Sequence, residues 1–187
     1  MNPVWDSQGW HMRARHAPSP YCDARPPGMA VDLIVVHAIS LPPERFGSGD
    51  VVRFFQGQLD FSCHPYYAQL RDLRVSAHFF IERDGVLWQH VGIGGRAWHA
   101  GQSCWKGRPS CNDFSVGIEL EGSETQPFTD AEYGTLTRLV GDLRSHFPHI
   151  GPDAVAGHAE IAPGRKWDPG PFFEWSRLRE PAGAGGC

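Results

Sequence analysis

Residues 31–37 read VDLIVVH, and the fold depends on this apolar, β-branched run. A continuous apolar run of strand length is typical of a central strand that is buried on both faces of a sheet. Its last residue, His37, brings an imidazole to the end of the predicted strand. Because strand ends are where α/β and mixed sheets present ligands, His37 is a candidate metal ligand. A core histidine bonded to a carbonyl group is the alternative.

Two further stretches predict strands of the same sheet. Residues 113–121, DFSVGIELE, alternate apolar and polar side chains with the period of a strand, so Glu119 lies on the face opposite the apolar row. If that face lines a pocket, Glu119 is a desolvated carboxylate suited to general-base catalysis; if it faces water, it is an ordinary surface residue. Residues 77–83 and 86–91 predict a hairpin, because the Asp84-Gly85 dipeptide between them is the one that a tight turn requires.

One amphipathic helix is predicted to cover the sheet. Thr129 and Glu132 have the spacing of a capping box, and apolar residues follow at helical spacing as far as Phe147, before Pro148 ends the run. The stretch around 50–59 is compatible with a second helix. It lies in a connection, residues 40–76, whose length is typical of a lid or a binding loop.

The ends of the chain contain little regular pattern. Residues 1–30 are rich in proline and predict an irregular arm that wraps the core. Residues 172–178 predict a short helix, and the last seven residues, PAGAGGC, predict a flexible tail at 181–187. We therefore expect one domain over residues 1–187, of the α/β (α+β) class, with a single mixed β-sheet flanked by helices.

Residues 157–170, GHAEIAPGRKWDPG, hold a His, a Lys and an Asp close together in the sequence. The prolines deny this stretch a continuous helix; in an extended chain Lys166 and Asp168 share a face, and the loop can fold back to bring His158 beside Asp168. A catalytic zinc takes three protein ligands and leaves a fourth position for water, so His37 is the candidate third ligand. The alternative is a surface loop with an exposed Lys–Asp ion pair that contributes little.

Length, charge and cysteine usage exclude several classes of protein. At 187 residues with 41% hydrophobic residues, the chain has the size of one domain with a real core. Its net charge of -4 argues against a nucleic-acid or membrane-surface partner. The N-terminus lacks the pattern of a signal peptide, and no stretch approaches the roughly 18 apolar residues of a membrane span. Five cysteines without a Cys-x-x-Cys spacing predict a reduced, cytoplasmic protein.

Two residues outside the candidate zinc site are candidates for substrate contact. Trp98, in the RAWHAG stretch at 96–101, can stack on a sugar ring, although a tryptophan that roofs the core is the commoner case. Arg74, at the end of the long connection, can hold a carboxylate of a substrate.

Five motifs occur in a characteristic order: VVHAIS (35–40), SAHFFIERDG (76–85), AWHAG (97–101), CNDFSVGIELEG (111–122) and GHAEIAPGRKWDPGP (157–171). In this order they strongly resemble the zinc amidases of peptidoglycan, the family that includes the bacteriophage lysozyme-type amidases and the peptidoglycan recognition proteins. The resemblance runs from about residue 10 to residue 173, and it implies a mixed β-sheet flanked by helices.

The resemblance also implies a set of site residues. One Zn²⁺ per chain is held by His37, His158 and Asp168, Lys166 stabilises the developing oxyanion, and Glu119 transfers the proton of water to the leaving amine. The relatives most similar to this chain act on 1,6-anhydro-N-acetylmuramoyl-L-alanine compounds. They imply an anhydromuropeptide substrate, a place in cytoplasmic peptidoglycan recycling that indirectly limits β-lactamase induction, and no protein, nucleic-acid or membrane partner.

Two positions depart from the family pattern. Phage-type relatives carry a Tyr where this chain has Ala77, which removes one catalytic group and leaves proton transfer to Glu119. An Arg is common before the Cys of the CNDF motif, where this chain has Ser110, so Arg108 is a candidate stand-in for substrate binding.

Two other functions fit the same motifs. A non-catalytic peptidoglycan-binding or sensor module on the same fold would be expected to lose a zinc ligand, and all three candidates are present. A zinc peptidase that cleaves within the stem peptide would use similar chemistry, and product analysis separates it from an amidase.

Overall fold

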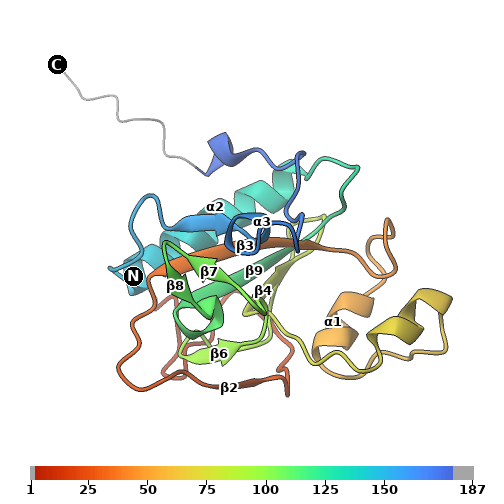
Figure 1. The fold of residues 1–187 in the computed structure, drawn as a ribbon, viewed down its shortest axis with the longest axis horizontal. Helices are drawn as coiled ribbons and strands as arrows, with labels where there is room; N and C mark the ends of the chain where they lie inside the picture. Colours follow the sequence, from red (N-terminus) through yellow and green to blue (C-terminus); the bar gives the residue numbers. More distant parts are fainter. Residues whose placement is uncertain (1–2, 179–187) are drawn as a thin grey trace.

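A six-stranded mixed sheet forms the centre of the computed structural model, which describes residues 3–178 (Figure 1). Neighbouring strands are parallel except for the antiparallel pair β4 and β5, which is the predicted hairpin. The mixed sheet predicted from the sequence is therefore confirmed. The strands, in spatial order, are β1 (Arg15–His16), β5 (Leu87–Gln89), β4 (Phe79–Ile81), β9 (Ser115–Glu121), β3 (Leu33–Ile39) and β10 (Val155–Gly157).

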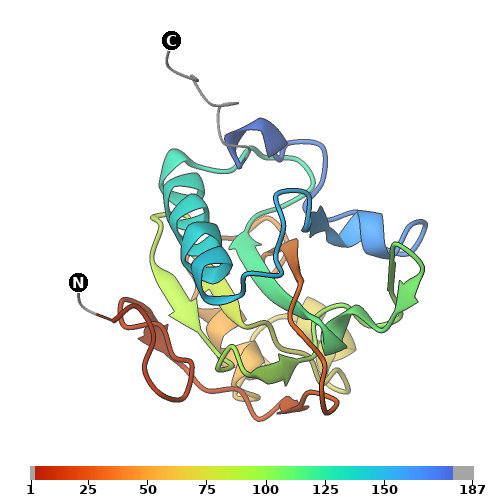
Figure 2. The same ribbon diagram turned by 90° about the vertical axis from the view of Figure 1, so that its left-hand side faces the viewer.

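Helices and small hairpins surround this sheet. The long helix α2 (Asp130–His146) lies across one face of the sheet, as Figure 2 shows. The short helix α1 (Asp50–Phe55) lies to the right of the labelled strands in Figure 1. A one-turn helix, α3 (His158–Ile161), follows β10 directly. The remaining elements are the antiparallel pairs β2 (Cys22–Ala24) with β6 (Gly95–Ala97) and β7 (Cys104–Trp105) with β8 (Arg108–Pro109), and the 3₁₀ helices η1 (Pro65–Leu70), η2 (Cys111–Asp113) and η3 (Trp175–Arg177).

The two faces of the sheet have different chemistry. Ile34 and Val36 of β3, with Val116, Ile118 and Leu120 of β9, face α2 and form the largest core cluster with its apolar stripe. Because side chains alternate along a strand, the odd-numbered residues of β3 and β9 face the other way. That second face carries the apolar Leu33 and Val35, which pack in a further core cluster, and then the polar His37, Glu119 and Glu121. Its polar groups therefore gather toward the carboxyl ends of the two strands.

The connection 40–76 builds a separate core cluster beside the sheet. Apolar side chains of α1 and η1, among them Phe55, Tyr67 and Leu70, pack there against Phe80 of β4. The predicted helix around 50–59 is confirmed over the bounds of α1, and the connection is packed rather than free of contacts.

Several predicted boundaries were wrong. β3 begins at Leu33 because its partner β9 begins at Ser115, and the ladder then runs on to Ile39, so His37 lies inside the strand rather than at its end. The N-terminal arm contributes β1 and β2 to the sheets and is less irregular than predicted. Within 172–178 only the single 3₁₀ turn η3 forms. The predicted tail at 181–187 lies outside the described residues.

None of the helices between residues 3 and 178 is long and apolar enough to cross a bilayer.

The predicted capping box at the start of α2 is confirmed. The Thr129 hydroxyl accepts a hydrogen bond from the Glu132 amide at 3.1 Å, and the Glu132 carboxylate accepts one from the Thr129 amide at 2.7 Å. Thr129 also donates to the carbonyl of Arg83 at 2.7 Å, which ties the helix to the hairpin. This residue therefore fixes where the main covering helix begins.

We predict that Thr129→Ala lowers the free energy of unfolding by about 0.5–2 kcal/mol, since it removes the N-cap acceptor. Chemical denaturation followed by circular dichroism measures this change. Thr137→Ala is the control, because Thr137 is exposed in the interior of the same helix and alanine is the better helix former there. Equal losses for both variants would contradict a specific role of the cap.

Candidate metal centre

Strand register places the first two of the candidate ligands side by side. Gly157 of β10 pairs with Val36 of β3, so the next residue of each segment, His158 and His37, also lie next to each other. The chain then turns back, and the amide of Ala159 donates to the carbonyl of Asp168 at 2.8 Å. This contact holds the third candidate against the start of α3.

Three side-chain atoms converge at this point. His37 Nδ1 lies 2.9 Å from His158 Nδ1 and 3.2 Å from Asp168 Oδ2, and His158 Nδ1 lies 3.1 Å from the same carboxylate oxygen. All three residues are buried, and they are the group of His, Asp, Glu or Cys side chains within residues 3–178 that has the geometry to hold a metal ion. The structure thus brings together the residues predicted as metal ligands.

The outer nitrogens of the two imidazoles are both engaged. His158 Nε2 lies 3.1 Å from the carbonyl oxygen of Ala100, which only accepts, so this nitrogen carries the proton and Nδ1 presents a lone pair. His37 Nε2 lies 2.9 Å from Nδ1 of His99. Contacts of this kind orient the histidines of metal sites and select the nitrogen that is free to bind.

Electrostatics keep the group in the protonation states that a cation needs. Burial is the main cause that lowers the pKa of His37, to about 4, so its imidazole is neutral at pH 7. Burial alone would raise the pKa of Asp168, but its contacts with His158 and His37 outweigh it and lower this pKa below its usual value. The charged carboxylate of Asp168 and the neutral imidazole of His37 therefore face each other in a buried site of low dielectric.

The donor set fits a divalent cation of the zinc type. Lone pairs of nitrogen and oxygen that converge without a proton between them repel one another, and a cation at their centre removes that cost. Tetrahedral zinc with bonds of about 2.0–2.1 Å holds its ligand atoms about 3.3 Å apart. The spacings of 2.9–3.2 Å are close to that value, so His37, His158 and Asp168 need only small movements to bind the ion.

Glu119 lies beside this group on the sheet. It pairs in register with His37 across β9 and β3, and paired residues of parallel strands face the same side. Its Oε2 atom is buried and has no hydrogen-bond partner within the described part of the chain. Burial raises the pKa of Glu119 well above its usual value, the charge of Asp168 raises it further, and Lys166 opposes the shift. A carboxyl group with a raised pKa holds a proton more readily than an ordinary glutamate does, which suits it to a role in proton transfer.

A cavity of about 670 Å³ opens onto both Glu119 and the metal-binding group. The exposed Lys166 lines it together with Asp168, as predicted for two side chains on one face of the loop. The exposed Arg74 and the half-buried Trp98 also line it. The walls come from the connection 40–76, the segment 98–101, the segment after β9 and the loop 157–170.

The structure places Arg108, a predicted substrate contact, outside the cavity, so the structure does not support that prediction. Its guanidinium forms an ion pair with Asp32 at 2.6 Å and lies 3.8 Å from the ring centroid of Phe114. It does not line the cavity described above. Arg108 belongs to the short hairpin of β7 and β8, which the sequence pattern did not predict, and this hairpin turns it away from the site. Ala77 is fully buried in the second core cluster.

Sequence reasoning also missed three residues near the site. Arg165 lines the cavity and donates to the carbonyl of Ala100 at 2.6 Å, although its neighbour Lys166 was singled out. His99, in the AWHAG motif, contacts His37. Asn112, in the CNDF motif, accepts hydrogen bonds from the amides of His99 and Ala100. Both motifs are visible in the sequence. Their contacts, however, join segments that are far apart in the chain, and the spacing of residues within a motif does not predict such contacts.

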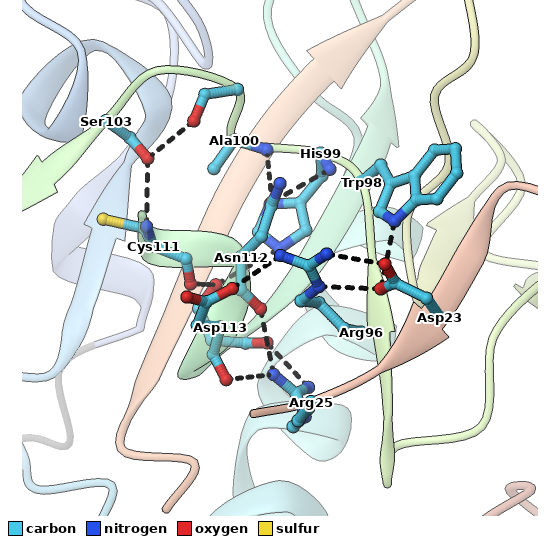
Figure 3. A network of polar contacts seen from close by, with 12 residues as sticks. Asp23, Arg25, Arg96, Trp98, His99, Ala100, Ser103, Cys111, Asn112 and Asp113 are labelled. Carbon is cyan, nitrogen blue, oxygen red and sulfur yellow. Dashed lines mark hydrogen bonds and ion pairs between the residues drawn. The ribbon is translucent and has the colours of Figure 1, made fainter. Parts of the chain in front are cut away.

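Figure 3 shows the polar network in which these contacts lie. Arg96 bridges Asp23 and Asp113 with hydrogen bonds of 2.6–2.7 Å. Arg25 donates to the carbonyls of Asn112 and Asp113, both at 3.0 Å. The N-terminal arm and the CNDF motif are therefore joined behind the metal-binding group.

Comparison with known proteins gives a consistent result. The model of the N-acetylmuramoyl-L-alanine amidase family matches residues 27–171. The 1,6-anhydro-N-acetylmuramyl-L-alanine amidase AmpD of Haemophilus influenzae is 52% identical over 163 residues, which cover 87% of this chain and 89% of that protein. The AmpD of Escherichia coli is 49% identical over 172 residues, 92% of this chain and 93% of that protein.

Solved structures agree with the sequence comparison. A crystal structure of a Se-Met AmpD derivative has a TM-score of 0.90 and 48% sequence identity, and the match covers 94% of this chain and 97% of that one. The amidase AmiD of Escherichia coli, in complex with the substrate anhydro-N-acetylmuramic acid-L-Ala-D-gamma-Glu-L-Lys, has a TM-score of 0.59 and 30% identity, over 94% of this chain and 64% of that one. The chain belongs to the N-acetylmuramoyl-L-alanine amidase family.

Proposed function

We propose that this protein is a zinc-dependent amidase of cytoplasmic peptidoglycan recycling. Its substrate is an anhydromuropeptide, and it hydrolyses the amide bond between the lactyl group of 1,6-anhydro-N-acetylmuramic acid and L-Ala. The names of the AmpD relatives and the substrate in the AmiD complex support this reaction and this substrate. We further propose that residues 1–187 form a single amidase domain.

One observation carries the proposal: the metal-binding group and an unpartnered, buried carboxyl oxygen of Glu119 open onto the same cavity. A bound zinc would supply Lewis-acid chemistry, which activates water at a pH of about 7 and polarises a carbonyl group. His37, His158 and Asp168 would hold the ion. A sensor module needs no proton-transfer group beside such a site, so the position of Glu119 favours an enzyme.

Glu119 is proposed to move the proton. It accepts a proton from the attacking water and gives it to the leaving amine of L-Ala, since an amine does not leave as an anion. The direction of its pKa shift supports this role, because a carboxyl group of ordinary pKa is a weak acid catalyst at neutral pH.

Lys166 is proposed to stabilise the negative charge that develops on the carbonyl oxygen. Its ammonium acts on both groups: it opposes the upward shift of the Glu119 pKa and adds to the downward shift of the His37 pKa, so its positive charge lies near both the base and the metal-binding group. Its exposed position at the cavity leaves the ammonium free to meet a substrate oxygen.

Arg74 and Trp98 are proposed to bind the rest of the substrate. Arg74 donates to two backbone carbonyls and lies 5.6 Å from the centroid of the Tyr21 ring, so its guanidinium is held at the cavity and can meet a carboxylate of the stem peptide. Trp98 is fixed by a hydrogen bond from its indole nitrogen to Asp23 at 3.2 Å and presents a ring to a sugar.

Mass spectrometry of the products tests the reaction. With anhydromuropeptide as substrate, we expect free 1,6-anhydro sugar carrying its lactyl group and an intact stem peptide that begins with L-Ala. A metal chelator is expected to abolish the products, and added zinc to restore them. Cleavage within the stem peptide would establish the peptidase instead, and binding without products would establish the sensor module.

A second prediction separates catalysis from metal binding. Glu119→Gln and Lys166→Ala should keep their fold and one zinc per chain, because neither residue is in the ligand group. Turnover should fall about 10²- to 10⁴-fold for Glu119→Gln and about 10²- to 10³-fold for Lys166→Ala, mostly in kcat. Lys166→Arg should restore only part of the rate, since a planar fork does not reproduce a point charge.

Elemental analysis and steady-state kinetics measure these effects together. Loss of zinc from Glu119→Gln would make Glu119 a ligand, and near-normal kcat would remove it from the mechanism.

A further inference from the structure

His99 and Ala100 lie directly behind the two histidines of the metal-binding group. The side chain of His99 contacts His37 at 2.9 Å, and the carbonyl of Ala100 meets His158 at 3.1 Å. The ring of His99 crosses that of His37 at an interplanar angle of 85°, and both side chains are buried. One dipeptide thus touches the outer nitrogen of each histidine.

The direction of the hydrogen bonds at His99 is fixed by a chain of contacts behind it. Ser115 Oγ lies 2.6 Å from the carbonyl oxygen of Cys111, and its single proton is donated there because a carbonyl only accepts. Ser115 Oγ must then accept from His99 Nε2, at 3.2 Å. His99 Nε2 therefore carries the proton of a neutral ring, and His99 Nδ1 is an acceptor.

An acceptor at His99 Nδ1 determines the tautomer of His37. His37 Nε2 must donate to it, so the proton of the neutral His37 imidazole lies on Nε2 and the lone pair lies on Nδ1. The Nδ1 atom is the one that faces His158 and Asp168. If these hydrogen bonds ran in the opposite direction, His37 Nδ1 would carry the proton and point an N–H group at His158 and Asp168. It could not then bind a cation.

The backbone around His99 is held for this contact. Asn112 Oδ1 accepts from the amides of His99 and Ala100 at 3.1 and 2.8 Å, as Figure 3 shows. On strand β9, a Cβ atom at Gly117 would lie only 2.4 Å from the His99 ring. The absence of a side chain at Gly117 therefore gives the ring the space that brings it to His37.

We propose that His99 is a positioning residue, which holds His37 in the tautomer and orientation required for metal binding, and that Ser115 and the Cys111 carbonyl set the direction of this hydrogen-bond chain. The inference deepens the proposed function, since it rests on the metal centre at His37. His99 itself need not touch the substrate.

A matched pair of variants tests the proposal. Asparagine and leucine have nearly the same shape, but His99→Asn keeps an acceptor near the former Nδ1 atom and His99→Leu has none. We expect His99→Leu to weaken zinc binding about 10- to 100-fold, the usual effect of losing an outer hydrogen bond to a ligand histidine. His99→Asn should recover most of the affinity. Competition with a zinc chelator measures both, and circular dichroism checks the fold.

Nitrogen chemical shifts of the metal-free wild-type protein give an independent readout. At a pH where His37 is neutral, we expect its proton on Nε2. A proton on Nδ1 would overturn the inference, as would equal zinc affinity of folded His99→Leu and His99→Asn. Failure of the proposed function looks different: wild-type protein that releases no L-Ala peptide would refute the amidase, while the tautomer of His37 would still be decided by the spectrum.

Discussion

The site depends on the parallel pairing of β3 with β9 on one side and with β10 on the other. This register sets Glu119 beside His37 and brings the end of β10, with His158 after it, to the same edge. Backbone hydrogen bonds along three strands therefore determine where a base and two ligands meet. Only Asp168 reaches the group from a loop, and a backbone contact to Ala159 holds it there.

Placing so many buried polar groups on one face of a sheet is costly, because each loses its hydration. The apolar face packed on α2 offsets part of that cost. The outer nitrogens of both histidines have partners, because His158 contacts the Ala100 carbonyl and His37 contacts His99. The unpartnered oxygen of Glu119 and the converging lone pairs are exceptions that lie where a substrate or a cation would bind.

Much of this arrangement could be predicted from the sequence because the signals are local. The capping box of α2, the Asp84-Gly85 turn and the apolar run of β3 each depend on neighbouring residues. The grouping of His37, His158 and Asp168 followed from the resemblance of whole motifs. The placement of Arg108 and the contacts of His99 could not be predicted, since they depend on how distant segments pack and on which hydrogen-bond partner each atom finds.

Side chains from three segments of the chain are proposed to hold one zinc ion. The most direct test is elemental analysis of purified protein together with two histidine variants. We expect one zinc per chain in the wild type and in His149→Ala, which changes an exposed histidine outside the site, and none in a folded His37→Ala. Stoichiometric zinc in His37→Ala, or active wild-type protein without stoichiometric metal, would contradict it.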